Sequence, residues 1–413
     1  MRANPLLLCP LLFAATAPVV AQAEEHLANL FTQGKPLLDL RYRYERVDQD
    51  NAGEHADAQT LRTRAGFQSG SWYGFSGLFE VDNVSHIGEE RFNDTRNGRV
   101  QYPLVGDPDG TEINQALLRY EHGRGSAVVG RQRIELDNQR FVGSVAWRQN
   151  EQTYDGALAQ WRPLDGLTLT YAYLDNVNTP FGPDGQHGYP TNPANIEGHS
   201  QLFNLAYAWR AELKVSAYSY LLGLDNLALA PAAAPGSQSS RTSGLRLTGV
   251  RNGFSYALEY ARQRDYAGNP LALNSHYVLG ELGYQYGGYL AKVGYEVLGG
   301  ENGPGNRAFQ TPLATKHLFQ GWADQFLITP ADGIRDRYVG GSLPLLGGSL
   351  QVWYHDFRAD QGGAHYGKEL DLAYSRPIPQ IKNLSAMAKY ARYDADQFGV
   401  DTDKFWLQLQ YRY

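Results

Sequence analysis

The stretch Leu38-Asp39-Leu40-Arg41-Tyr42-Arg43-Tyr44-Glu45 alternates strictly between two kinds of side chain. Every even-numbered position is apolar or aromatic, and every odd-numbered position is charged. Because successive side chains of a β-strand point to opposite faces, one face of this strand can contact hydrocarbon while the other requires water or polar partners. The pattern therefore predicts a membrane-spanning β-strand.

Similar alternating segments recur to the end of the chain. They cover residues 38–45, 61–67, 73–81, 115–121, 127–133, 154–161, 167–174, 202–209, 213–221, 242–250, 254–262, 277–286, 289–298, 337–343, 349–357, 368–374, 384–392 and 404–413. We predict about eighteen strands, and an even number lets an antiparallel sheet close with both termini on the same side.

The connections between these segments alternate in length. Short turns rich in Gly, Pro, Asn and Asp occupy residues 69–71, 122–125, 163–166, 251–253, 287–288 and 346–348. Long polar loops occupy residues 83–110, 137–152, 175–198, 225–240 and 299–336. Short periplasmic turns and long extracellular loops are typical of outer-membrane barrels. The sequence thus predicts an all-β fold, a single transmembrane antiparallel β-barrel.

Composition agrees with a barrel and restricts its partners. The chain has 45 Gly, 28 Tyr and 12% aromatic residues, which suits short strands, tight turns and aromatic girdles. A mean hydropathy of -0.46 resembles that of a soluble protein. In a barrel, however, lipid-facing apolar residues alternate with polar lumen residues, so the mean hydropathy stays low. A secreted β-sandwich or β-helix is the alternative, although neither explains the alternating connections. The net charge of -6 argues against nucleic acid as a partner.

The N-terminus has the pattern of a secretory signal peptide. Arg2 precedes an apolar run over residues 5–20, and Ala21-Gln22-Ala23 forms a cleavage site. We predict a signal peptide at residues 1–23, a short periplasmic leader at 24–36 and the barrel at 37–413. The apolar run is short and broken by prolines, which argues against a transmembrane helix.

Cys9 is the single cysteine of the chain and lies within the predicted signal peptide. It precedes any complete apolar region, which argues against a lipid-modified cysteine. The mature chain is therefore expected to have neither a disulfide nor thiol chemistry.

The C-terminal segment ends on an aromatic residue. Phe405, Leu407, Leu409, Tyr411 and Tyr413 alternate with more polar neighbours. Barrel precursors share such a terminal strand, which the outer-membrane assembly machinery reads. We therefore expect two partners, this machinery and outer-membrane lipid, and a location in the bacterial outer membrane.

Arginine is frequent at the positions that would face the lumen in the N-terminal part of the barrel. Five arginines have the polar parity of their strands, namely Arg41, Arg43, Arg62, Arg64 and Arg119. Two more, Arg131 and Arg133, would join them if a β-bulge accommodates their neighbours. Basic residues of later strands would extend the surface, namely Lys214 and Arg246, with Lys292 and Lys389. Such a basic wall is expected to attract anions and to hydrogen-bond carboxylates.

Two interpretations of these arginines remain open. Asp39, Glu45 and Glu80 share the lumen parity, and arginines in barrel interiors commonly pair with carboxylates across strands. For a single arginine, structural pairing is the better interpretation. For the whole wall we expect solute contact, because carboxylates on the far side of a wide barrel lie beyond a Debye length of roughly 8 Å.

Catalytic and cofactor motifs are not found in the sequence. The histidines are scattered, and neither a zinc-protease motif nor a nucleophile elbow nor a phosphate loop occurs. We predict no catalytic residues, cofactor or metal. An outer-membrane hydrolase using Ser275 and His276 would require both residues on the outer wall of the barrel.

Several carboxylates fall in predicted loops and admit two interpretations. They could hold calcium, or they are simply solvated loop acids, which is the preferred interpretation. These residues are Asp48, Asp50, Asp94, Asp107 and Asp109.

Two loop regions resemble the alginate export family of outer-membrane porins. The first spans residues 130–134 and 137–143, and the second spans residues 308–317 and 319–330. The resemblance extends from Leu37 to the C-terminus and implies an eighteen-stranded barrel with an arginine-rich conduit for an anionic polysaccharide. It assigns the conduit role to Arg131 and Arg133 directly, and to the other arginines by parity alone.

The same resemblance makes both long loops candidates for a constriction, folded inward or over the mouth. The residues expected there are Asp137, Asn138, Arg140, Trp322 and Asp324. Trp322, with Phe319 and Phe326, predicts an ordered loop, because exposed aromatic rings are costly.

The sequence thus predicts a channel that passes an anionic polysaccharide or oligosaccharide, such as alginate or another uronate, by passive diffusion. A general or small-anion porin is one alternative, because the family name covers other solutes and the lumen also contains many carboxylates. A structural or adhesion barrel plugged by its loops is an alternative of another class.

Overall fold

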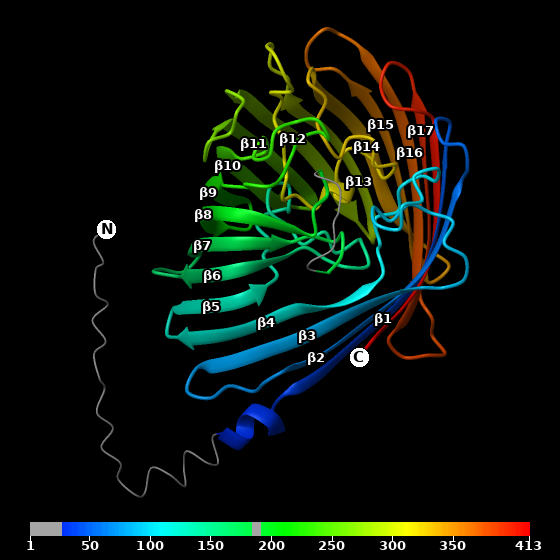
Figure 1. Ribbon diagram of the computed structural model, residues 1–413. Helices are drawn as coiled ribbons and strands as arrows, with labels where there is room; N and C mark the ends of the chain where they lie inside the picture. Colours follow the sequence, from blue (N-terminus) through cyan, green and yellow to red (C-terminus); the bar gives the residue numbers. More distant parts are fainter. Residues whose placement is uncertain (1–26, 184–190) are drawn as a thin grey trace, which may run out of the picture.

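A computed structural model describes residues 27–183 and 191–413. Eighteen antiparallel strands form one sheet that closes on itself, because β1 pairs with both β2 and β18 (Figure 1). The strands are β1 (Lys35–Gln49), β2 (Ala56–Gln68), β3 (Phe75–His86), β4 (Gly110–His122), β5 (Gly125–Gln132), β6 (Thr153–Trp161), β7 (Leu167–Asn178), β8 (Asn195–Arg210), β9 (Leu213–Leu222), β10 (Ser240–Arg251), β11 (Phe254–Asp265), β12 (Asn274–Tyr286), β13 (Tyr289–Gly299), β14 (Gly333–Leu345), β15 (Gly348–Arg358), β16 (His365–Pro377), β17 (Leu384–Ala395) and β18 (Thr402–Arg412).

The barrel, its strand number and the position of every predicted strand are confirmed. Strand β1 starts at Lys35, two residues before the predicted boundary, and residues 27–32 of the predicted leader are helical. The predicted signal peptide lies outside the described residues. Within the described ranges, no helix is long and apolar enough to cross a membrane.

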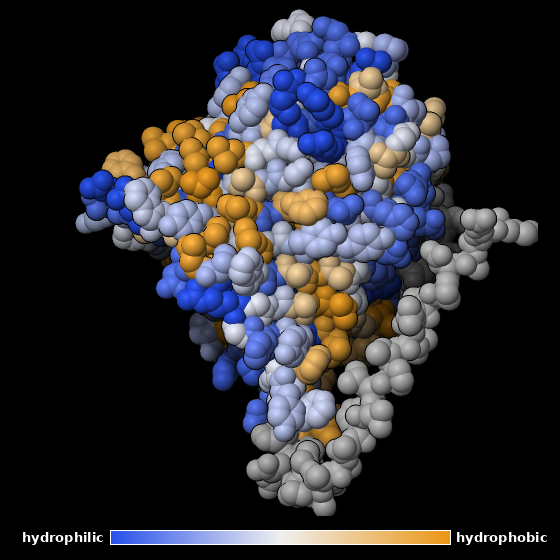
Figure 2. Space-filling model, turned by 90° about the vertical axis from the view of Figure 1, so that its left-hand side faces the viewer, coloured by the Kyte–Doolittle hydropathy of each residue, from blue (hydrophilic) through white to orange (hydrophobic). Residues whose placement is uncertain are grey.

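Side chains of β1 alternate between the lumen and the outer face as the sequence predicts. Arg41 and Arg43 are buried on the inner face, whereas Leu40, Tyr42 and Tyr44 are more accessible. The outer face of later strands carries exposed apolar residues, gathered in patches on the side of the wall that Figure 2 shows. Such a surface fits the hydrocarbon of a bilayer.

The long connections all lie at one end of the barrel, and the short turns lie at the other end. Loop 133–152, which joins β5 to β6, and loop 300–332, which joins β13 to β14, fold into the lumen (Figure 1). They pair with each other through a parallel bridge between Val142 and Leu313. The Gly143 N–H donates to the Leu313 carbonyl over 2.9 Å, and the Thr315 N–H donates to the Gln139 carbonyl over 3.1 Å.

The lumen is less polar than strand alternation alone suggests. Phe141 and Phe309, one from each inward loop, pack with Tyr218 and Tyr277 of the barrel wall in a buried apolar cluster. Aromatic residues at lumen positions of β9 to β17 thus contact the loops instead of water. The burial of this apolar surface holds the loops inside the barrel.

Candidate functional site

Four of the predicted arginines meet in one cavity on the side of the short turns. Arg41, Arg62, Arg64 and Arg133 line this cavity of about 370 Å³, together with Asp39, Glu80, Ala146, Glu151 and Tyr413 among others. We call it the inner chamber. Its arginines come from neighbouring strands, as the predicted basic wall requires, and register places Arg41 directly opposite Arg62.

Carboxylates accompany these arginines at short range. Arg62 Nη2 lies 2.7 Å from Asp39, and Arg64 Nη2 lies 2.6 Å from Asp82. Glu151, from loop 133–152, lies 3.1 Å from Arg64 and also pairs with Arg133. Burial alone would raise the pKa of Glu151, but Arg64 and Arg133 outweigh burial and hold this pKa below its ordinary value. Arg62, Arg64 and Arg133 thus have the carboxylate partners expected of single arginines.

The carboxylates that neutralise the wall are not on the far side of the barrel. They lie on the adjacent strands and on loop 133–152, at ion-pair distance from the arginines and therefore well within a Debye length of roughly 8 Å. Nε of Arg62 is buried and has no hydrogen-bond partner among the described residues.

Loop 133–152 also covers Arg41 and Arg43. Arg41 Nε donates to Oε1 of Gln149 over 2.9 Å, and Arg41 Nη1 donates to the Ala146 carbonyl over 3.0 Å. The Arg43 guanidinium lies over the Trp147 ring at 4.1 Å and donates to Gln408 over 2.8 Å. These contacts explain why both arginines are nearly inaccessible.

The remaining predicted lumen cations lie elsewhere. Arg119 and Lys214 are exposed towards the short turns, and Arg119 lies 3.4 Å from Glu121. Arg246 of β10 lies on the opposite wall, where it pairs with Glu259 of the neighbouring strand β11. Arg131 has the parity of the outward Val129 and pairs with Asp155 over 2.8 Å, so the structure does not bring it into the basic wall. The polar neighbour Asp155 is what allows an arginine on this face.

The predicted constriction residues of loop 133–152 contact the far wall. Asp137 accepts hydrogen bonds from Asn204 and Ser216, each over 2.8 Å, and Asn138 follows it in the same bend. Arg140 is buried, donates to Glu296 of β13 over 2.7 Å, and lies over the Phe319 ring at 4.6 Å. The loop therefore spans the lumen from the basic wall to the wall formed by β8, β9 and β13.

The predicted residues of loop 300–332 contact β17 and β18. Trp322 covers the ammonium of Lys389 at 3.7 Å, and Asp324 accepts a hydrogen bond from Lys404 over 2.9 Å. Phe319 and Phe326 pack as ordered residues, the latter against Phe357 at 4.7 Å between ring centroids. The prediction that this loop is an ordered element is confirmed.

His317 links Asp324 to Lys389. Its Nδ1 lies 2.8 Å from Asp324, and its Nε2 lies 2.6 Å from the ammonium of Lys389. Burial lowers the pKa of His317 to about 3 despite the neighbouring Asp324. Burial would raise the pKa of Asp324, but His317 and Lys404 hold it well below its ordinary value. A neutral His317 therefore donates to an ionised Asp324 and accepts from Lys389.

A second cavity lies on the side of the long loops. Its volume is about 530 Å³, and its lining includes Arg148, Lys316, His317, Asp324 and Lys404. We call it the outer chamber. Within the described residues, it shares no lining residue with the inner chamber.

Residues 145–152 form the partition between the two chambers. Val145, Arg148 and Gln152 line the outer chamber, whereas Ala146 and Glu151 line the inner one. This segment therefore lies between the two chambers.

Several residues of this site are not identified by the sequence pattern. Arg148, Gln149, Lys316 and His317 lie in inward loops, where strand alternation gives no signal. Lys404 has the lumen parity of β18, and this parity would have identified it.

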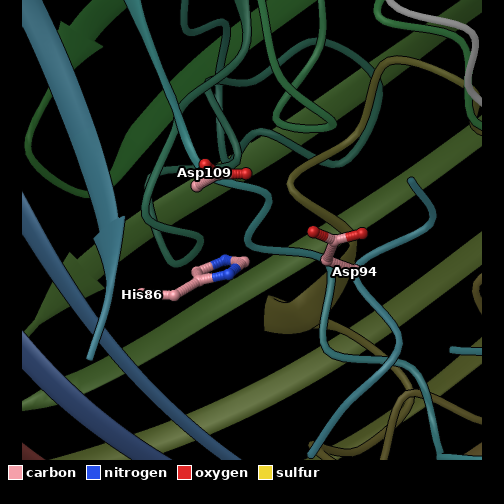
Figure 3. Close-up of side chains that lie close together, drawn as sticks. All are labelled: His86, Asp94 and Asp109. Atoms are coloured by element: carbon pink, nitrogen blue, oxygen red, sulfur yellow. The ribbon is translucent and has the colours of Figure 1, made fainter. Parts of the chain in front are cut away.

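The loop carboxylates include a compact group with a histidine. One ligand atom each of His86, Asp94 and Asp109 lies within 4.8 Å of the other two, and Figure 3 shows these side chains around a common space. The His86 ring already contacts the Asp107 carbonyl at 2.9 Å, and Asp94 accepts from the N–H groups of Arg96 and Asn97. Asp94 and Asp107 are buried, so the interpretation as solvated acids is wrong for these two. Their contacts stabilise loop 87–109.

The hydrolase alternative required Ser275 and His276 on the outer wall. Ser275 has the inward parity of Tyr277 and is 1% exposed. The two residues therefore do not form a site on the lipid face.

Solved porin structures have the same fold. The barrel matches Pseudomonas aeruginosa OccK3 (OpdO) with a TM-score of 0.70 and 17% identity, over 94% of this chain and 98% of that chain. It matches Acinetobacter baumannii OccAB4 with a TM-score of 0.70 and 14% identity, over 92% and 98%. P. aeruginosa OpdK, solved with vanillate, gives a TM-score of 0.70 and 17% identity, over 93% and 99%.

A search among curated proteins finds no match. The sequence model of the alginate export family, in contrast, matches residues 37–306, which include most of β1, the whole of β2 to β13 and the whole of loop 133–152. The matched segment is more than half of the chain, and the fold is that of outer-membrane porins. This barrel of the bacterial outer membrane belongs to the alginate export family.

Proposed function

We propose that this barrel is a passive channel for anionic solutes, up to the size of a short uronate oligosaccharide. The observation that carries the proposal is the sequence of cationic side chains along the lumen, Lys316 and Arg148 in the outer chamber followed by Arg62 and Arg133 in the inner chamber. Cations that line a narrow aqueous path raise the local concentration of anions and select them over cations.

The partition between the chambers favours small solutes over a polymer. Residues 145–152 are held by the bonds from Arg41 to Gln149 and Ala146, and by the ion pairs of Glu151. Passage of an alginate chain would require the loss of these contacts, because a polymer occupies both chambers at once. A short oligomer or a monomer requires smaller fluctuations of the segment.

A plugged structural barrel remains the alternative of another class. The same partition favours it, because Val145 and Gln152 of this segment donate hydrogen bonds to Thr315 and Leu313 of loop 300–332. The two hypotheses differ in permeability, because a plugged barrel passes no solute.

Uptake by liposomes that contain the full-length protein tests the size limit. We expect rapid swelling in glucuronate, slower swelling in its dimer and trimer analogues, and very slow swelling with long alginate chains. Neutral sugars of equal size should enter more slowly than the acids. Equal rates for neutral and acidic sugars would contradict anion selection, and no swelling with any solute would support the plugged barrel.

A further inference from the structure

The outer chamber combines a cationic floor with apolar walls. Three cationic residues line it, Arg148 and Lys316 from the two inward loops and Lys404 from the start of β18, and we call these three its floor. Its walls include Leu104, Phe181, Ile196, Leu227, Leu229 and Leu327. A volume of about 530 Å³ lies within the range of roughly 300–1,000 Å³ that is usual for small-molecule sites.

Two of the three cations on the floor have protein partners. Arg148 lies 3.2 Å from Glu45 and 3.5 Å from Asp107, and Lys404 lies 2.9 Å from Asp324. His317 is also engaged on both ring nitrogens. The carboxylates near the floor are therefore already occupied by these groups.

Lys316 differs from its neighbours on the floor. Its ammonium forms no hydrogen bond or ion pair with any residue that the structure describes, although it is partly buried. Burial, followed by the charge of Arg140, lowers the pKa of Lys316 to about 8. At neutral pH the side chain is still mostly protonated, and an anionic ligand would compensate its charge.

We propose that the outer chamber is a binding site for monocarboxylates with an apolar body of aromatic size, whose carboxylate pairs with Lys316 while the apolar body contacts the leucine and phenylalanine walls. The inference rests on the proposed channel function and specifies the class of solute that this end of the channel retains. A charge-assisted hydrogen bond to Lys316 supplies orientation, and apolar contact supplies selectivity.

The wall chemistry distinguishes such a ligand from a sugar acid. Glucuronate offers the same carboxylate, but apolar side chains outnumber amide and hydroxyl side chains such as Gln152, Thr179 and Gln238 in the lining, so several of its hydroxyl groups would lack hydrogen-bond partners. Burial of an unpaired hydroxyl is unfavourable, so an apolar acid should bind more tightly than a sugar acid of similar size.

Calorimetric titration of the detergent-solubilised full-length protein tests the site with benzoate and glucuronate as probes. We expect benzoate to bind more tightly than glucuronate. Lys316→Gln should weaken benzoate binding by about tenfold or more, because a hydrogen bond to a charged group is lost. Lys316→Arg should retain binding, which separates loss of charge from misfolding.

Lys214→Gln is the matched control, because Lys214 is an exposed lumen lysine near the short turns and far from the outer chamber. It should leave the affinity for benzoate unchanged. Equal effects of Lys214→Gln and Lys316→Gln, or glucuronate binding as tight as benzoate binding, would overturn the proposal. Binding in micelles does not depend on permeation, so failure of the channel function in liposomes and failure of this site are separate results.

Discussion

Lys389 of β17 donates a hydrogen bond from its ammonium to Nε2 of His317 over 2.6 Å, beneath the rings of Trp147 and Trp322. This contact attaches loop 300–332 to the barrel wall, and Trp147 belongs to the other inward loop. The bond requires a neutral imidazole, because a doubly protonated ring has no acceptor nitrogen. The attachment of the loop therefore depends on the protonation state of His317.

Acidification should weaken the docking of loop 300–332. The pKa of docked His317 is about 3, whereas a solvated histidine titrates near 6.5. Between these values the undocked loop binds a proton that the docked loop excludes, so docking loses up to about 1.4 kcal/mol for each pH unit below 6.5. Single-channel recordings should therefore show larger current fluctuations at pH 4.5 than at pH 7.5.

The variant His317→Gln should lose this acid response, because glutamine does not titrate. His122→Gln provides the control, since His122 is exposed next to a short turn and should retain the response. An acid response that persists in His317→Gln would assign the effect to other groups.

Loss of Arg140 should release loop 133–152 from the far wall. Arg140→Gln leaves Glu296 buried without its guanidinium partner, and breaking such a buried pair typically costs about 3–5 kcal/mol. We expect a higher mean conductance and faster proteolysis within the loop than in the wild-type protein. Arg140→Gln combined with Glu296→Gln should restore part of the wild-type behaviour, and a double variant no better than the single one would contradict this role of the charge pair.

Affinity for benzoate should decline as the pH rises from 7 to 9. The pKa of Lys316 is lowered to about 8 by burial and by Arg140, so its ammonium loses its proton within this range. Calorimetric titration at several pH values measures the change. The same titration of Lys316→Arg should show a nearly constant affinity, because a guanidinium stays protonated. A constant affinity of the wild-type protein would show that Lys316 does not carry the interaction.

The fold was predictable because each strand carries a local signal. The alternation from Leu38 to Glu45 identifies the inner and outer faces of β1 before any contact is known. Arg131 shows the limit of this signal, because its position on the outer face depends on the cross-strand partner Asp155.

The candidate site was only partly predictable. The bond from Arg140 to Glu296 joins residues 156 positions apart, and the partition at residues 145–152 depends on where two long loops meet. Neither arises from local periodicity. The resemblance of the two loops to a family identified them as constriction candidates, but Lys316 and His317 acquired roles only through tertiary contacts.

The reversal potential in a planar bilayer under a KCl gradient tests anion selection most directly. We predict an anion-selective wild-type channel, and a permeability ratio reduced by roughly twofold or more in the variant Arg62→Gln with Arg133→Gln, which removes two charges from the inner chamber. Arg131→Gln, which removes a charge outside the basic wall, should leave the ratio unchanged. A cation-selective wild-type channel, or an equal loss of selectivity in Arg131→Gln, would contradict the account.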